Sequence, residues 1–243
     1  LPEPVAYGAT VDMGDSLLLI GGNNQEHSLR QVVSVKLDPR GNANVMRLPS
    51  LPVTVDNGAA AYAKGHVFVF GGNQNGKPSK ALWSLSCSRP TSQWKSRKAM
   101  PGKPRVQPVC VAHGQRLFAW GGFYAKGAKS KVATDGYAYD VKRNRWAQLD
   151  APRDAAGESL TLSGATGATN GAGLLLCLGG VNKTIFADAI SGKYQLVDQA
   201  DYLKHPVAWY RSNATPLVFN AKTLRWLKPT NPAARLARWG DLP

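Results

Sequence analysis

Short apolar runs separated by polar turns recur along the chain at a nearly constant interval. Four of the runs end in a pair of glycines, and these pairs lie 50, 50 and 58 residues apart. The runs occupy residues 16–20, 66–70, 116–120 and 174–178. A glycine-containing turn signal lies upstream of each run, and small residues lie upstream of the turn. Each repeat is therefore predicted to form a strand of small residues, a tight turn and an apolar strand ending at the glycine pair.

Two further strand-like segments follow each glycine pair. Third strands are expected at residues 32–37, 81–86, 136–141 and 215–220, and fourth strands at 44–48, 93–97, 145–149 and 225–228. Trp94, Trp146 and Trp226 lie in three of the fourth strands. A period near 50 residues with a double glycine and a late tryptophan is typical of Kelch repeats. We therefore predict an all-β fold, a Kelch-type β-propeller.

The length of the chain sets the number of blades. The 243 residues divide into repeats at about 1–50, 51–100, 101–150 and 151–231, which we interpret as a single propeller domain. At about 50 residues per blade, about five blades' worth of sequence is present. Residues 232–243 fall where another first strand should begin. The propeller is therefore expected to be incomplete at both ends.

The fourth repeat is longer than the others. Its glycine pair and its tryptophan are 46 residues apart, against 22 and 24 in the second and third repeats. The excess, at about 183–211, carries Phe186, Ile190, Tyr194 and Val197 at mostly helical spacing. We predict a helical insert on the ligand-binding face, and a lid and a surface decoration both remain open.

The charge of the chain is strongly basic. Lys and Arg number 30 against 15 Asp and Glu, and residues 57–134 hold 13 basic residues and no acidic one. Such a surface favours an anionic ligand and equally attracts nucleic acid, although basic surfaces also serve solubility. The basic residues are scattered over several repeats without a nucleic-acid motif, so we expect no nucleic-acid partner. No apolar run is long enough for a membrane span, and the oligomeric state is not predicted.

The loops on one face of the predicted propeller carry the candidate chemistry. Because strand direction alternates, the leading loop before each first strand and the loop after each glycine pair open on the same face. The leading loops are expected at residues 6–7, 56–57, 105–107 and 153–158. Converging amides, charges and aromatic rings suit a polyhydroxylated ligand, although any single Asn is also a common turn former.

Individual residues of these loops are candidates for binding and catalysis. Arg105 is expected to position an anionic group, and Asp56 and Glu158 are the acid–base candidates. The candidate contacts to hydroxyl and amide groups are Asn57, Asn73, Gln107 and Asn182. His205 and Arg211, which end the insert, complete the predicted substrate-binding set.

Four segments, residues 48–57, 104–109, 179–186 and 205–211, resemble the cyclically permuted mutarotase or N-acetylneuraminate epimerase family of Kelch-like propellers. The resemblance implies a six-bladed propeller that interconverts the anomers of an anionic monosaccharide, N-acetylneuraminate, by acid–base ring opening. It implies a periplasmic or secreted location. It also implies a longer chain whose final stretch carries a catalytic Glu and Arg, neither of which has a counterpart here.

Two other functions compete with a mutarotase. The same face of a non-catalytic Kelch propeller would bind a glycan or a protein partner. A copper radical oxidase is also built on Kelch blades, but its chemistry needs His, Tyr and Cys ligands around one metal. The four histidines are isolated in different repeats, and the three cysteines lack metal-ligand spacing. We therefore expect no metal and no other cofactor.

Overall fold

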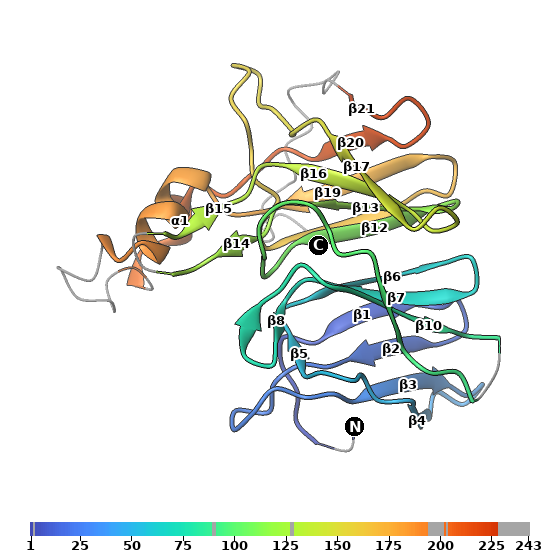
Figure 1. Cartoon of the computed structure of the whole chain (residues 1–243). Helices are drawn as coiled ribbons and strands as arrows, with labels where there is room; N and C mark the ends of the chain where they lie inside the picture. The colour runs from blue at the N-terminus through green and yellow to red at the C-terminus, as the bar shows by residue number, and fades with distance from the viewer. Residues whose placement is uncertain (2, 89–90, 127–128, 194–201, 203, 228–243) are drawn as a thin grey trace.

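The computed structural model describes residues 1, 3–88, 91–126, 129–193, 202 and 204–227. Its main elements are four antiparallel sheets of four strands, in the order in which the strands follow along the chain (Figure 1). The first sheet contains β1 (Ala9–Asp12), β2 (Leu17–Ile20), β3 (Val32–Leu37) and β4 (Ala43–Leu48). The second contains β6 (Ala59–Ala63), β7 (His66–Phe70), β10 (Leu82–Ser86) and β11 (Lys95–Arg97).

The third and fourth sheets repeat this order. The third contains β12 (Val109–His113), β13 (Arg116–Trp120), β16 (Gly136–Asp140) and β17 (Arg145–Leu149). The fourth contains β18 (Ala165–Thr169), β19 (Leu174–Gly179), β20 (Leu217–Asn220) and β21 (Arg225–Trp226). The predicted all-β propeller architecture is confirmed. The described residues form four blades, because the additional residues of the fourth repeat form loops and a helix and add no further sheet. The domain boundaries remain a prediction.

The hydrophobic core is divided among the spaces between neighbouring sheets. The first strands pack side by side, β1 on β6, β6 on β12 and β12 on β18. One apolar cluster joins the first and second sheets, another the second and third, and the largest the third and fourth. In the largest, Trp120 and Phe219 are fully buried with ring centroids 4.8 Å apart. Alternating apolar positions therefore stabilise contacts between blades as well as within each sheet.

The tryptophan near the end of each of the last three repeats hydrogen-bonds to the preceding blade. Trp94 Nε1 donates to the Pro49 carbonyl at 2.7 Å, and Trp146 Nε1 donates to Lys98 at the same distance. Trp226 Nε1 donates to Asp150 at 2.9 Å. The acceptor carbonyl lies just beyond the fourth strand of the preceding sheet in all three cases. The periodic tryptophan therefore provides both ring packing and one hydrogen bond between blades.

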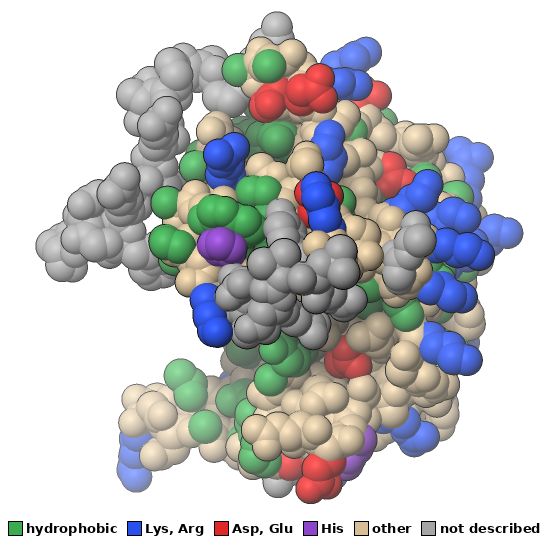
Figure 2. All heavy atoms as spheres, turned by 90° about the vertical axis from the view of Figure 1, so that its left-hand side faces the viewer, with side chains coloured by type: hydrophobic (Ala, Val, Ile, Leu, Met, Phe, Trp, Pro, Cys, Tyr) green, Lys and Arg blue, Asp and Glu red, His purple; other side chains and the backbone are tan. Residues whose placement is uncertain are grey.

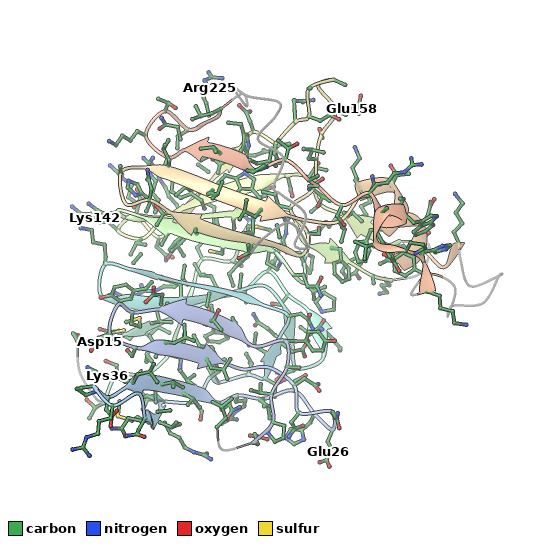
Figure 3. All side chains as sticks on the ribbon, turned by 180° about the vertical axis from the view of Figure 1, so that it is seen from behind. Asp15, Glu26, Lys36, Lys142, Glu158 and Arg225 are labelled. Atoms are coloured by element: carbon green, nitrogen blue, oxygen red, sulfur yellow. The ribbon has the colours of Figure 1, made fainter. Side chains whose placement is uncertain are left out.

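Smaller elements gather on one face, on the left in Figure 1. They are β5 (Val55–Asp56), β8 (Asn73–Gln74) and β9 (Lys77–Pro78), β14 (Phe123–Tyr124) and β15 (Lys131–Val132), the helix α1 (Lys183–Ile190) and the 3-10 helix η2 (Val207–Tyr210). Glu26 and Glu158 lie on this side of the molecule, and Asp15, Lys36 and Lys142 lie on the opposite side (Figure 3). We call the first side the loop face. Among the described residues, no helix has the length and apolar character needed to cross a bilayer.

The three cysteines are free and are expected to differ sharply in reactivity. Burial raises the pKa of Cys177 and of Cys110 to about 12, so both stay protonated at pH 8, whereas Cys87 is exposed and burial raises its pKa less. Because only the thiolate reacts, we expect Cys87 to be alkylated before the other two thiols in the folded protein, and all three to be alkylated in denaturant. Mass spectrometry after iodoacetamide treatment measures this. Rapid labelling of Cys177 without denaturant would contradict the packing described above.

Candidate functional site

One residue from each sheet's leading loop forms a continuous backbone string across the loop face. Asn57 N–H donates to the Tyr7 carbonyl at 2.9 Å, Gln107 N–H to Asn57 at 2.7 Å, and Gly164 N–H to Gln107 at 3.0 Å. All four residues have positive φ, between 50° and 70°. This conformation is unfavourable for residues other than glycine and persists where surrounding contacts impose it. We call Tyr7, Asn57, Gln107 and Gly164 the inter-blade string.

A network of side-chain amides is built on this string. Gln107 Nε2 donates to Asn57 Oδ1 at 3.0 Å, and Asn57 Nδ2 donates to Asp56 Oδ1 at 2.8 Å. Asn73 Nδ2 also donates to Asp56 Oδ1 at 2.8 Å, and Ser28 donates to the other carboxylate oxygen. The Asn73 and Gln107 side-chain oxygens accept no hydrogen bond from the described residues. Three of the predicted contacts, Asn57, Asn73 and Gln107, are therefore brought together with acceptors left for a ligand.

Asp56 differs from its predicted role. It is 7% exposed, and its carboxylate accepts from Ser28, Asn57 and Asn73. A carboxylate that accepts hydrogen bonds from three donors fixes the orientation of those donors. We therefore assign Asp56 to positioning the amides, in place of the acid–base role expected from the sequence. Ser28 was missed because it lies 28 residues away, in the preceding repeat.

Arg105 also departs from expectation. The residue is 2% exposed, and its Nη1 donates to Asp135 Oδ1 at 2.8 Å and to the Gly121 carbonyl at 3.0 Å. Nη2 lies 3.3 Å from the second Asp135 oxygen, and the guanidinium carbon lies 5.9 Å from the centre of the Tyr137 ring. The guanidinium is thus buried between the second and third blades and bound to protein groups there. The predicted role of a substrate-positioning cation does not fit this placement.

The leading loop of the fourth repeat was predicted at the wrong residues. Gly164 takes the position that Asn57 and Gln107 hold in their own blades, because its N–H continues the inter-blade string. Ser163, the residue before it, accepts from Val181 N–H at 3.0 Å, so the true leading loop of the fourth blade lies at these two residues. Residues 153–158 belong to a longer excursion in which Arg153 pairs with Ser159. Glu158 lies there on the exposed surface, with its N–H donating to Asp154 Oδ1 at 2.9 Å. Figure 3 shows it at the fourth-blade end of the molecule.

The predicted helical insert is present as α1, which packs on the hairpin of the third blade. Phe186 meets the Phe123 ring edge-on at 4.9 Å, and Ser130 Oγ donates to the Ile190 carbonyl at 3.0 Å. Asn182 caps the helix, because its Oδ1 accepts from Thr184 and Ile185 N–H at 3.0 and 3.1 Å. The Asn182 side chain therefore acts as a cap rather than as a free ligand contact. Tyr194 and Val197 lie outside the described residues.

The end of the insert returns to the fourth glycine pair. Asn213 N–H donates to the Gly180 carbonyl at 3.0 Å, and the Arg211 carbonyl accepts from Asn182 Nδ2 at 3.4 Å. His205 stacks on Trp209 with ring centroids 3.8 Å apart. Arg211 is exposed, and its guanidinium contacts no carboxylate among the described residues. Arg211, rather than Arg105, is the predicted arginine that is free on the loop face.

Arg211 is one of four basic residues that occupy equivalent positions in the four blades. In each blade, a residue shortly before the third strand donates its N–H to the carbonyl of the second glycine of the pair. The four hydrogen bonds are Leu29 to Gly22, Ser79 to Gly72, Ala133 to Gly122 and Asn213 to Gly180. The residues two positions earlier are His27, Lys77, Lys131 and Arg211. All four are exposed on the loop face. We call these residues the basic rim. Figure 2 shows the loop face, with Lys and Arg side chains gathered along one edge.

Metal chemistry receives no support from side-chain clustering. In the part of the chain that the structure describes, no three His, Cys, Asp or Glu side chains approach closely enough to hold one ion. The residues predicted to bind substrate are amides and arginines with one imidazole, that of His205, and a single histidine is not a copper-ligand set. The arrangement suits recognition of an anion that carries hydroxyl or amide groups, because the rim supplies positive charge and the string supplies oriented amides.

The chain is similar to proteins named N-acetylneuraminate epimerase. It is 33% identical over 149 residues to the one from Yersinia enterocolitica, an alignment covering 59% of this chain and 35% of the relative. It is 27% identical to that of Salmonella enteritidis, with 80% of this chain and 50% of the relative covered, and 28% identical to that of Haemophilus influenzae, with 78% and 48% covered. The chain thus spans half or less of the length of these relatives.

The fold is shared with a solved structure. The structure of YjhT superposes with a TM-score of 0.63 at 23% identity, covering 79% of this chain and 54% of that one. The cyclic permutation implied by the sequence resemblance is not tested by these comparisons. The family model of N-acetylneuraminate epimerase matches residues 48–235, which is most of the chain and includes three of the four blades. The chain therefore belongs to the N-acetylneuraminate epimerase family.

Proposed function

We propose that the loop face binds N-acetylneuraminate and that the protein takes part in exchanging its α and β anomers. The observation that carries the proposal is the basic rim, which places a basic side chain at the equivalent position of all four blades beside the amide network. The names of the relatives point to the same sugar. Its carboxylate would pair with a rim cation, and its hydroxyl and amide groups would meet Asn73 and Gln107.

Mutarotation sets clear chemical requirements. A base takes the proton of the anomeric hydroxyl while an acid protonates the ring oxygen, and the open chain rotates before the sequence reverses. Proton transfer alone completes this cycle, so no electron acceptor is consumed. Because the Asp56 carboxylate accepts from three donors, we propose Glu158, which is exposed, as the acid–base residue, and Arg211 as the cation that orients the substrate carboxylate.

A second function is favoured by one specific observation. The two predicted acid–base carboxylates do not meet, because Asp56 is buried under the first and second blades' loops and Glu158 lies exposed near the fourth blade (Figure 3). A binding module that holds the sugar without exchanging its anomers would have the same rim and the same amides. In either case we propose a periplasmic or extracellular location, where an anionic sugar is met before uptake.

Replacing Arg211 with glutamine is expected to weaken N-acetylneuraminate binding about tenfold, because a charged hydrogen bond to the carboxylate is lost. Binding of the neutral sugar N-acetylmannosamine should stay unchanged. Isothermal titration calorimetry measures both affinities. Arg47 is the matched control, because it is exposed on the outermost strand of the first blade and its replacement by glutamine removes the same charge. An equal loss in both variants would contradict a specific role for the rim.

A further inference from the structure

A pocket of about 500 Å³ lies away from the loop face, on the second blade. It opens beside β7, β10 and β11, at the ends of these strands that are remote from the glycine pair, because His66 begins β7 and Ser86 ends β10. The lining residues are His66, Ser84, Ser86, Gln93, Lys95 and Arg97, with hydroxyl groups from the loop before β11. We propose that this pocket binds a tetrahedral oxyanion, phosphate or sulfate, carried on a small polar molecule.

The charge of the pocket favours an anion. Lys95 and Arg97 line it, and none of the described residues that line it carries a carboxylate. The nearest acidic residues in the sequence are Asp56 and Asp135, and both are committed elsewhere, one to the amide network and the other to Arg105. Nothing in the lining therefore neutralises the two cations, and the field inside a partly enclosed pocket is stronger than on an open surface.

The guanidinium of Arg97 is held in place for such a ligand. Ser84 is only 1% exposed, and its Oγ accepts from Arg97 Nε at 2.7 Å. The two Nη groups of Arg97 have no carboxylate or carbonyl partner among the described residues. A planar fork fixed by its Nε matches the spacing of two oxygens on a phosphate or sulfate group. Because the orientation is already set, binding needs little loss of side-chain freedom.

The remaining lining supplies neutral hydrogen-bonding groups around the cations. His66 Nδ1 lies 2.9 Å from the Lys64 carbonyl and therefore donates to it, which leaves Nε2 of that tautomer as an acceptor for a hydroxyl group of the molecule that carries the oxyanion. Ser86 and Ser88 share a hydrogen bond at 2.8 Å, so one hydroxyl proton of the pair remains to be donated. Hydroxyls and a guanidinium are the ordinary donors to oxyanions, and the pocket volume suits a molecule larger than the oxyanion itself.

The test uses calorimetric titration of the protein with sodium phosphate, sodium sulfate and glucose 6-phosphate at constant ionic strength, with glucose as the neutral arm. We expect saturable binding of the three anions and no binding of glucose. Arg97→Gln should weaken the affinity for the anions at least about tenfold. Lys142→Gln is the matched control, because Lys142 is exposed on the same side of the molecule and lies outside the pocket (Figure 3). Its effect should stay below about twofold.

A second variant keeps the test decisive if Arg97→Gln fails to fold. Lys95 is exposed and makes no side-chain hydrogen bond within the described residues, so Lys95→Gln should fold normally and still weaken phosphate binding several-fold. The absence of saturable binding for every anion would overturn the proposal. An equal weakening by Lys142→Gln and by the pocket variants would also overturn it, since it would show diffuse attraction to a basic surface.

Discussion

Replacing Asp135 with alanine should lower the free energy of unfolding by about 3 kcal/mol, because it leaves the Arg105 guanidinium buried without its counter-ion. Arg105 is 2% exposed, and both of its Nη groups reach Asp135 oxygens, at 2.8 and 3.3 Å. The Asp135 side chain is 33% exposed, so water reaches one side of the pair and places the loss near the lower end of the range for buried pairs. Urea unfolding followed by tryptophan fluorescence measures the change.

The control for this experiment is another ion pair of the same sheet. Asp140 binds Arg143 at 2.8 Å, but the Arg143 side chain is mostly exposed. Asp140→Ala should therefore cost no more than about 1 kcal/mol. If Asp135→Ala and Asp140→Ala proved equally mild, Arg105 would not depend on Asp135, and its exclusion from the ligand-binding set would lose its basis.

Substituting Gly121 with alanine should destabilise the protein by at least about 2 kcal/mol more than substituting Gly114 in the same blade. Both glycines have similar positive φ, 66° and 61°. A Cβ at Gly121 would lie 2.5 Å from the Leu162 carbonyl carbon and 2.6 Å from the Ser163 nitrogen, whereas nothing lies within 4 Å of one at Gly114. Backbone atoms of the next leading loop cannot yield as a flexible side chain can.

The comparison separates backbone strain from crowding between blades. Gly114→Ala should cost about 1–2 kcal/mol from the left-handed conformation alone. Thermal unfolding should show the further loss for Gly121→Ala as a decrease in Tm of about 4–8 °C, since 1 kcal/mol shifts a domain of this size by about 2–4 °C. Equal Tm values for the two variants would mean that the glycine pair is not pressed against the neighbouring blade.

The strands were predictable because their signals are local. The apolar runs Val67 to Phe70 and Leu117 to Trp120 are buried as expected, and the tryptophans of the fourth strands pack where the repeat puts them. The helix also had a local signal, since Asn182 precedes it as an N-cap residue. That same signal should have favoured the capping role of Asn182 over a ligand contact.

The features that were missed depend on partners far away in the sequence. Asp135 lies 30 residues from Arg105, and no periodic pattern links the two. The basic rim follows its glycine pair after 5, 5, 9 and 31 residues, so loops of different length hide an equivalence that only backbone hydrogen bonds reveal. The long excursion at residues 153–159 had the same effect and shifted the predicted leading loop of the fourth blade away from Gly164.

The most direct test of the account is exchange NMR of N-acetylneuraminate in the presence of the protein, since cross-peaks between the two anomers report the exchange rate. We predict a rate that rises in proportion to protein concentration and falls when Glu158 is replaced with glutamine. An exchange rate that remains at its uncatalysed value, while calorimetry shows that the sugar is bound, would contradict a mutarotase and leave a sugar-binding propeller.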